Sequence, residues 1–267
     1  MEVLFWLGDS AKKRKGICER MTKGMITYFQ KGFNYDQDGP GNRLVIHMQG
    51  CNMNCLWCAN PEGLPRRGGQ SISPLALAEE IVSCKSLFFD QGGVTFSGGE
   101  ATMQFQELEE VLTLLKEEDI HTAIETNGTH PDLERLFPLL DLLIIDCKQV
   151  DDRIHKERTG TSNQEILMNI RKAALLHSHV WIRIPLVNGF NTKAEDLEGF
   201  VSFAKEITDN AGENRVRFEF LPYHEYGKSK WMASGREYSI DNGFVSEETL
   251  AKFKETFEQN GLPVHRT

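Results

Sequence analysis

Short apolar runs alternate with helical patterns along most of this 267-residue chain, and that alternation restricts the folds open to it. The apolar runs predict six β-strands, over residues 43–48, 93–96, 121–125, 142–146, 180–185 and 216–221. The patterns that follow them predict helices over residues 74–88, 105–118, 132–136, 164–176, 194–208 and 247–259. Strands that each lead into a helix pair in parallel through right-handed crossovers. The sequence therefore predicts a parallel α/β fold, either a barrel or an open sheet.

The composition is that of a globular protein, with 40% hydrophobic and 26% charged residues. A net charge of −9 argues against general nucleic-acid binding, because neutralising phosphates requires clustered Lys and Arg. The apolar run at residues 3–7 ends at Asp9, far short of a membrane span or a signal sequence. We expect a cytoplasmic protein that binds neither nucleic acid nor membrane. We expect a single domain over residues 1–267, with an extension of unclear structure at residues 1–23.

Three cysteines, Cys51, Cys55 and Cys58, lie within eight residues directly after the first predicted strand. Three thiolates are one short of the four that saturate a zinc ion or a four-iron cluster. The spacing therefore suggests an iron–sulfur cluster with one iron left open, while a zinc knuckle with a distant fourth ligand stays open as the alternative. The remaining cysteines, Cys18, Cys84 and Cys147, have no second Cys nearby and are interpreted as buried thiols.

Polar residues follow several predicted strands, at the edge where β/α folds collect ligands. Gly98-Gly99-Glu100 offers exposed backbone and a carboxylate after the second strand. Asp146 and Lys148 alternate, so both side chains point to one face, as a ligand site or as an internal ion pair. Two further residues have open interpretations: a core arginine or a carboxylate clamp for Arg183, and a structural or a functional role for His224.

Seven segments, taken together, resemble the radical SAM superfamily. They are DGPGNR (38–43), CNMNCLWCANPE (51–62), GGVTFSGGE (92–100), IHTAIETNG (120–128), IIDCKQV (144–150), VWIRIPLV (180–187) and LPYHEYGKSKW (221–231). The cysteine loop is typical of the superfamily, and the DGPG, D-x-K and PYHE-x-GK segments are typical of the activating enzymes of glycyl radical enzymes. Within that group the activases of pyruvate formate-lyase are the most similar. The resemblance implies a partial (β/α)6 TIM-like barrel of parallel strands.

The resemblance also implies cofactors and their sites. Cys51, Cys55 and Cys58 would ligate a [4Fe–4S] cluster whose fourth iron binds the amino and carboxylate groups of S-adenosylmethionine (SAM). The implied SAM-binding residues are Trp57 beside the adenine, Ala59 through its backbone, Gly98, Gly99 and Glu100 at the amino group, Asp146 and Lys148 at the ribose and carboxylate, and Arg183 and His224 around them.

Two further sites are implied by the resemblance. Some relatives bind a monovalent cation beside the SAM carboxylate, at positions that correspond to Glu125, Thr126 and Asp146. Glu125 stands where the most similar relatives have Asp, and Ala59 stands where they have His. Asp38 would help to hold the glycine loop of a partner enzyme. No Cys-rich, ferredoxin-like insertion occurs in residues 60–73, so we expect one cluster only.

The implied activity is reductive cleavage of SAM to a 5′-deoxyadenosyl radical, which takes a hydrogen atom from the Cα of a glycine on a partner enzyme. That partner would be a glycyl radical enzyme such as pyruvate formate-lyase, and the electron would come from a flavodoxin- or ferredoxin-type reductant. We expect a monomer. Two alternatives stay open: a radical SAM enzyme that acts on a small molecule, and a non-catalytic zinc-knuckle or electron-transfer module.

Overall fold

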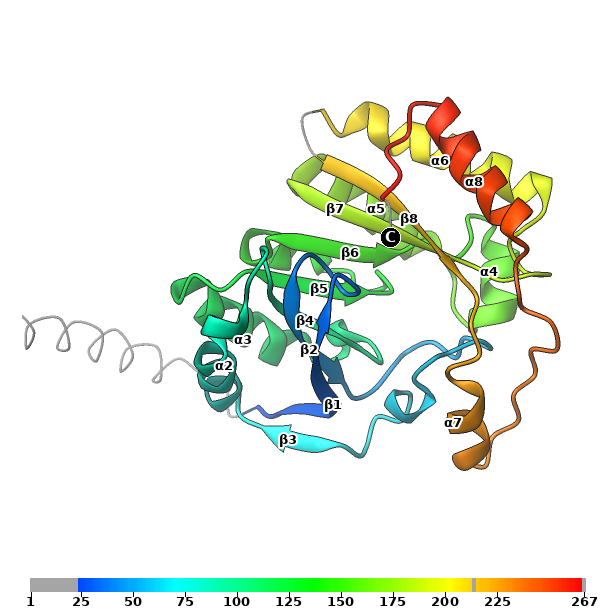
Figure 1. Cartoon of the computed structure of the whole chain (residues 1–267). Helices are drawn as coiled ribbons and strands as arrows, with labels where there is room; N and C mark the ends of the chain where they lie inside the picture. The colour runs from blue at the N-terminus through cyan, green and yellow to red at the C-terminus, as the bar shows by residue number, and fades with distance from the viewer. Residues whose placement is uncertain (1–23, 213–214, 266–267) are drawn as a thin grey trace, which may run out of the picture.

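Eight strands form one curved sheet in the computed structural model, which describes residues 24–212 and 215–265 (Figure 1). The strand order is β3-β1-β2-β4-β5-β6-β7-β8. The strands are β1 (Ile26–Tyr35), β2 (Asn42–Met48), β3 (Gln70–Ile72), β4 (Gly93–Gly98), β5 (Thr122–Thr126), β6 (Leu142–Asp146), β7 (His179–Leu186) and β8 (Arg215–Pro222).

The six predicted strands are β2 and β4 to β8, and they pair in parallel in the order of the chain. This confirms the predicted α/β class with an open, mostly parallel sheet. Two strands that were not predicted, β1 and β3, extend one edge of the sheet, where β1 pairs antiparallel with both β2 and β3. The strand over residues 42–48 is therefore the second strand of the chain, not the first.

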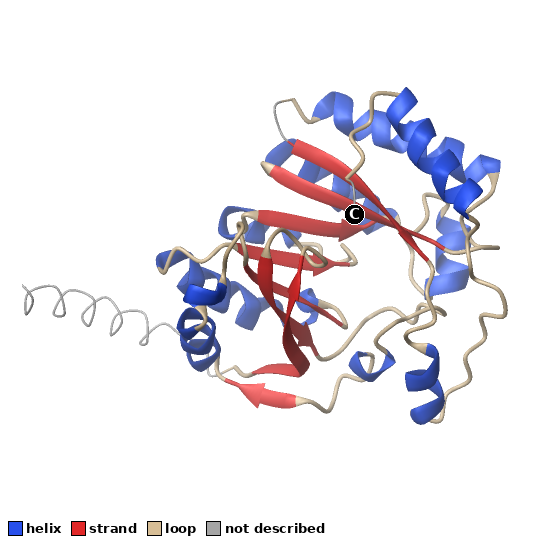
Figure 2. Cartoon of the chain, viewed as in Figure 1, coloured by secondary structure: helices blue, strands red, loops and turns tan. Residues whose placement is uncertain are grey.

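Helices cover the outer face of the sheet (Figure 2). The α-helices of the described residues are α2 (Pro74–Ser83), α3 (Phe105–Glu117), α4 (Asp152–Thr159), α5 (Gln164–Leu176), α6 (Ala194–Asn210), α7 (Lys228–Ala233) and α8 (Glu247–Gln259), and α7 lies apart from the outer face. Short 3-10 helices occur at η1 (Pro61–Gly63), η2 (Lys85–Leu87), η3 (Ala101–Gln104) and η4 (Leu133–Leu139). Fully buried side chains such as Leu112, Ile170 and Phe200 from the helices and Ile46 and Phe96 from the strands form the core between these layers.

Two predicted helices differ from the structure. The helix expected over residues 74–88 ends at Ser83 and continues as the separate helix η2. The helix expected over residues 132–136 is the 3-10 helix η4, which contains Pro138. Proline lacks the N–H that an α-helix needs and its ring obstructs the preceding turn, which accounts for the difference. The helices α4 and α7 were not predicted.

The parallel strands end at a common edge. In the register of the sheet, Met48 of β2 lies opposite Gly98 of β4, and Asp146 of β6 lies opposite Arg183 of β7. The segments that follow these strands therefore meet in space, as the sequence predicted. The extension at residues 1–23, including Cys18, lies outside the described residues. Among the helices that are described, we find none with the length and apolarity needed to cross a membrane.

Candidate active site

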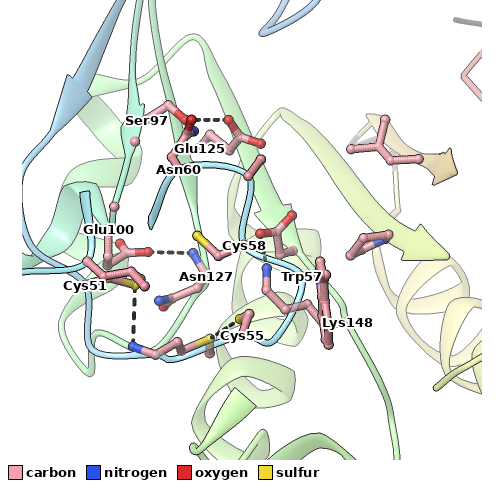
Figure 3. Close-up of a pocket in the computed structure, with 18 of the residues that line it drawn as sticks. Cys51, Cys55, Trp57, Cys58, Asn60, Ser97, Glu100, Glu125, Asn127 and Lys148 are labelled. Atoms are coloured by element: carbon pink, nitrogen blue, oxygen red, sulfur yellow. Dashed lines mark hydrogen bonds and ion pairs between the residues drawn. The ribbon is translucent and has the colours of Figure 1, made fainter. Parts of the chain in front are cut away.

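A cavity of about 250 Å³ lies where the parallel strands end (Figure 3). Most residues that the sequence proposed as site residues line it. They are Cys51, Cys55, Trp57, Cys58, Ala59, Gly98, Gly99, Glu100, Glu125, Thr126, Asp146, Lys148 and His224. In Figure 3, Cys51 lies beside Glu100, Asn127 lies in the middle, and Cys55 and Cys58 lie between Asn127 and the side chains of Trp57 and Lys148. Arg183 and Asp38 do not line this cavity.

The cysteine loop is held by several neighbouring segments. The N–H of Asn54 donates to the carbonyl of Thr159, the last residue of α4, at 2.9 Å. The Asn127 side chain, after β5, donates to the Asn52 Oδ1 at 2.8 Å. From the other side, the Trp231 indole N–H of α7 donates to the Cys58 carbonyl at 2.9 Å. The loop is thus positioned by segments that follow β5, β6 and β8.

The three thiols, one buried and two half-buried, favour their protonated form in the absence of a positive partner. Burial raises the pKa of Cys51 and of Cys55 to about 12, and that of Cys58 to about 11. Metal ligation requires thiolates, so a bound cationic centre would replace the three protons. Cys147 is buried elsewhere in the core and Cys84 ends α2, so neither supplies a fourth thiolate to the cavity.

The thiols form the donor set of a metal centre. Three thiols from one loop line a single cavity, and no other described thiol lines it. This donor set fits a [4Fe–4S] cluster with one open iron.

Gly98 and Gly99 are required by close packing of the chain against itself. A side chain on Gly98, whose φ is +110°, would place its Cβ 2.4 Å from the Met48 backbone nitrogen. A Cβ on Gly99 would lie 2.3 Å from the Gly50 carbonyl oxygen, directly before the cysteine loop. These glycines let β4 lie against the start of the cysteine loop as well as lining the cavity.

The Glu100 carboxylate joins two strand ends. It is buried and accepts hydrogen bonds from the Thr126 hydroxyl at 2.6 Å, the Asn127 N–H at 2.7 Å, and both the N–H and the hydroxyl of Thr102 at 2.9 and 2.5 Å. Burial raises the pKa of Glu100, and these hydrogen bonds oppose that shift. Its oxygens are occupied within the protein, so the geometry gives Glu100 a positioning role at the cavity wall.

Asp146 and Lys148 form an ion pair that lines the cavity. Burial and the neighbouring Glu125 raise the pKa of Asp146, and Lys148 opposes that shift. Burial acts to lower the pKa of Lys148, but the negative charge of Asp146 and that of an ionised Cys55 raise it overall. The sequence left open whether these residues form an internal ion pair or a ligand site. The structure shows the ion pair, and the pair also lines the cavity where a ligand would lie.

Arg183 is the centre of a buried group of carboxylates below the cavity. Its guanidinium donates to Glu219 at 2.5 Å and to Glu125 at 2.6 Å, and its Nη1 lies 3.4 Å from the Asp38 carboxylate. It also donates to the Gln37 carbonyl. Burial opposes ionisation of Glu125, yet Arg183 lowers the pKa of this carboxyl to about 2. Arg183 thus lies among carboxylates of the chain and does not line the first cavity, and its expected place around SAM stays a prediction.

A second cavity, of about 730 Å³, lies next to this charged group. Its lining includes the turn between β1 and β2, represented by Asp36 and Gln37, and residues of β7 and β8 such as Trp181 and Glu219. Leu221 lines both cavities. Arg183 thus stands between the two spaces, bonded to Glu125 at the first and to Glu219 at the second.

Trp57 and His224 line the cavity, and each packs against another aromatic ring. The Trp57 ring packs against Phe190 with centroids 4.6 Å apart. The His224 ring stacks on Tyr226 at 4.2 Å, and its Nδ1 accepts from the Tyr226 N–H at 3.3 Å. Burial lowers the pKa of His224, so the ring is neutral near neutral pH. An accepting Nδ1 places the ring proton on Nε2, where it can be donated to a ligand.

Sequence reasoning missed two residues that help to build the site. Ser97 lines the cavity and donates to Glu125 at 2.6 Å, and Asn127 links the cysteine loop to Glu100. Ser97 is the second-last residue of β4, and Asn127 directly follows β5. The sequence signal for both residues was their position near the end of a predicted strand. One sequence does not show which neighbouring segment each side chain contacts.

Known proteins resemble this chain in both sequence and fold. The Radical SAM superfamily model matches residues 45–204. Pyruvate formate-lyase 1-activating enzyme of Escherichia coli (strain K12) is 35% identical over 233 residues, covering 85% of this chain and 93% of that protein. The 4-hydroxyphenylacetate decarboxylase activating enzyme of Clostridioides difficile (strain CD196) is 30% identical over 311 residues, covering 91% and 96%. A crystal structure of a domain of pyruvate-formate lyase-activating enzyme from Bacteroides vulgatus ATCC 8482 superposes with a TM-score of 0.54 and 25% identity, over 65% of this chain and 98% of that one.

Enzymes of this kind use a [4Fe–4S] cluster and SAM, for which the cavity offers three thiols and a polar wall. The superfamily match spans more than half of the chain, and the two curated relatives cover most of its length. This chain therefore belongs to the radical SAM superfamily, among the activating enzymes of glycyl radical enzymes.

Proposed function

We propose that this protein activates its partner by reductive cleavage of SAM, with pyruvate formate-lyase as the glycyl radical enzyme that it serves. The single observation that carries the proposal is the loop of three thiols beside the cavity at the strand ends, with no fourth thiol among the residues that line it. The 35% identity to a pyruvate formate-lyase activating enzyme favours this partner.

Cys51, Cys55 and Cys58 would hold the cluster. When bound, the cluster supplies one electron for cleavage of SAM, and the resulting 5′-deoxyadenosyl radical takes a hydrogen atom from the partner's glycine. The chain's contribution is to hold the thiols, to orient the nucleotide and to exclude water. Asn127 and the Trp231 indole fix the loop by hydrogen bonds at 2.8 and 2.9 Å.

The remaining cavity residues would orient SAM. Trp57 offers an aromatic face for the adenine, and the His224 Nε2–H is available for donation. The Asp146–Lys148 pair supplies a carboxylate for hydroxyl groups and an ammonium for a carboxylate. Gly98, Gly99 and the backbone of Ala59 contribute surfaces without bulky side chains. Glu100 acts through Thr126 and Asn127 and holds this wall in place.

Glu125 serves Arg183 in this proposal, not a monovalent cation. Its two oxygens accept from Arg183 and from Ser97, both at 2.6 Å. Of the three positions that correspond to the cation site, Thr126 donates to Glu100 and Asp146 pairs with Lys148. The ligands of the expected cation are thus engaged with other groups of the chain.

The partner would reach the first cavity through the second. Leu221 borders both spaces, and the Asp38 carboxylate lies 3.4 Å from Nη1 of Arg183. Asp38 would contact a glycine-bearing segment that enters between the β1–β2 turn and the last two strands. We propose that the protein works as a cytoplasmic monomer and receives its electron from a flavodoxin- or ferredoxin-type reductant.

The test combines a product assay with a spectroscopic one. Anaerobically reconstituted protein is mixed with SAM, a chemical reductant and pyruvate formate-lyase, and we expect 5′-deoxyadenosine together with a glycyl radical doublet in the electron paramagnetic resonance spectrum. The Cys55→Ala variant should form neither product, whereas Cys84→Ala, a thiol outside the cavity, should form both.

Other outcomes would assign another function. Deoxyadenosine formation with no glycyl radical on pyruvate formate-lyase would reject this partner. Turnover of a small molecule without any protein partner would indicate the small-molecule class. One zinc per chain with no acid-labile sulfide would identify a zinc-knuckle module instead.

A further inference from the structure

A long connection between α7 and α8 packs behind one end of the first cavity. We call residues 234–246 the α7–α8 loop; they form no helix or strand, and most of them are exposed. Figure 1 shows this loop running from α7 to α8. Its buried or half-buried residues are Tyr238, Ile240, Gly243 and Val245. These inward residues show what the loop is attached to.

The α7–α8 loop is fixed to Tyr223, which directly follows β8 and lines the first cavity. The hydroxyl groups of Tyr223 and Tyr238 lie 2.7 Å apart and share a hydrogen bond. Phe244 packs edge-on against the Tyr223 ring, with centroids 5.2 Å apart. Gly243 lies against the same ring, where a Cβ would come within 2.8 Å of it. Three residues of the loop thus surround one tyrosine of the cavity wall.

Tyr223 belongs to a small apolar cluster that reaches Trp57. The buried members of this cluster are Val187, Phe190 and Tyr223. Trp57 and Tyr238, both half-buried, pack against it. Trp57 and Tyr223 line the cavity, whereas Tyr238 does not. Tyr238 therefore stands behind the wall that carries Trp57, the ring that we propose to lie beside the adenine.

Tyr238 also contacts the ring that holds the third cysteine. Its ring meets that of the buried Trp231 edge-on, with centroids 6.1 Å apart. The Trp231 indole donates to the Cys58 carbonyl at 2.9 Å. Tyr238 thus joins two parts of the cavity wall, the segment after β8 and, through Trp231, the cysteine loop. A residue in this position can set the spacing between the two.

From these contacts we infer that Tyr238 is a positioning residue for SAM. Its hydroxyl holds Tyr223, and with it the Trp57 side of the cavity, at the distance from the cysteine loop that the adenosine part of SAM requires. Because Tyr238 is not among the residues that line the cavity, it acts through Tyr223. The inference rests on the proposed function, since it takes SAM as the ligand of this cavity.

The test measures binding to the anaerobically reconstituted protein with its cluster left oxidised, so that no SAM is cleaved. Equilibrium dialysis gives the affinities for SAM and for methionine, which lacks the adenosine part. The variants are Tyr238→Phe, Tyr223→Phe and the double variant, each of which keeps the rings. Tyr28→Phe is the matched control, because it removes the hydroxyl of a buried tyrosine that donates to Gln70 at 3.2 Å and lines neither cavity.

We expect Tyr238→Phe to bind SAM roughly fivefold more weakly, because one net hydrogen bond is lost. Tyr223→Phe should lose about as much, and the double variant no more than either single one, since both substitutions remove the same bond. Affinity for methionine, iron content and acid-labile sulfide should equal those of the unsubstituted protein and of Tyr28→Phe. A loss confined to SAM assigns the effect to the adenosine end of the cavity.

Three results would overturn the inference. The first is unchanged SAM affinity in Tyr238→Phe. The second is an equal loss of affinity for SAM and for methionine, which would make Tyr238 a residue of the fold alone. The third is a loss of roughly 25-fold in the double variant, because independent effects multiply. An unsubstituted protein that holds its cluster yet binds no SAM would instead reject the proposed function, and the inference with it.

Discussion

Glu100 is a residue whose role depends on what its oxygens already bind. Four donors from Thr102, Thr126 and Asn127 converge on one buried carboxylate, and each bond lies between 2.5 and 2.9 Å. Because an ionised acceptor matches donors only, a neutral amide at this position would turn an NH₂ group toward N–H and O–H groups. The charge of Glu100 is thus part of the structure of the cavity wall.

We predict that Glu100→Gln lowers the free energy of unfolding by roughly 1 to 3 kcal/mol, because buried donors lose their acceptor. SAM affinity should fall as well, since Thr126 and Asn127 shift. Urea unfolding and equilibrium binding of SAM measure the two effects. Glu198→Gln, at an exposed position of α6, is the control and should leave both values unchanged. Wild-type stability in Glu100→Gln would contradict the assigned role.

Arg183 shows where residue-level prediction from sequence ends. A charged residue within an apolar strand is visible in the sequence, and either of two interpretations was possible. The choice depends on carboxylates that lie 36 residues away at Glu219 and 145 residues away at Asp38. Such partners are set by tertiary packing. The cysteines needed no such information, because their chemistry and spacing lie within one loop.

At the scale of elements, the cysteine loop depends on its neighbours for its shape. Asn52 lies between two residues of the segment after β5: its Oδ1 accepts from Asn127 at 2.8 Å and its Nδ2 donates to the Thr129 hydroxyl at 2.6 Å. The loop itself contains no regular helix or strand between Cys51 and Cys58. Bonds to other segments therefore hold the thiols at a fixed spacing.

The Asn52→Ala variant should release iron from the reconstituted protein faster than the unsubstituted protein does. Loss of these hydrogen bonds should cost about 1 kcal/mol, or roughly a fivefold rise in rate if opening of the loop limits release. Iron transfer to a chromogenic chelator under anaerobic conditions gives the rate. Asn260→Ala removes a side-chain hydrogen bond at the end of α8, far along the chain from the loop, and serves as control. Equal rates in the two variants would show that Asn52 does not hold the loop.

The elements themselves were largely predictable, because apolar runs and helical periodicity are local. All six parallel strands and the helices α3, α5, α6 and α8 lie close to their expected bounds. Strand β1 was missed because its second half alternates exposed and half-buried residues and includes Gly32, so it lacks an apolar run. Pairing with β2 and β3 stabilises β1, and the residues of β1 alone do not predict that pairing.

At the scale of the whole molecule, several histidines affect how stability changes with pH. His121 accepts a hydrogen bond from Arg43 on β2 at its Nδ1, at 3.2 Å, and also faces Asp141 before β6 and His179 at the start of β7. Burial, followed by the positive charge of Arg43, lowers the pKa of His121 to about 4. The folded protein therefore holds this ring neutral where the unfolded chain would protonate it.

The sign of the effect follows from proton binding. Between about pH 6.5 and pH 4 the unfolded chain binds a proton at His121 that the folded protein does not, so stability falls as the pH falls through this window. We predict that His121→Gln removes part of this slope. Between about pH 7.5 and about pH 5, the free energy of unfolding of the variant should fall by roughly 1 to 2 kcal/mol less than that of the unsubstituted protein. Urea unfolding at both values tests this, and the difference at the higher value measures the loss of packing alone. A slope identical to that of the unsubstituted protein would contradict the prediction.

The charged group around Arg183 has one more consequence, for the way an unclosed sheet keeps its shape. The Arg183 side chain of β7 binds the turn between β1 and β2 at Gln37 and Asp38. In a closed barrel, a ladder of main-chain hydrogen bonds would join these two segments. Such a ladder would close the side of the barrel. One guanidinium joins the two edges instead and leaves an opening beside it, lined by Trp181 and Leu221. In the entry route that we propose, a segment of the partner enzyme would pass through this opening to the nucleotide while every strand stays paired.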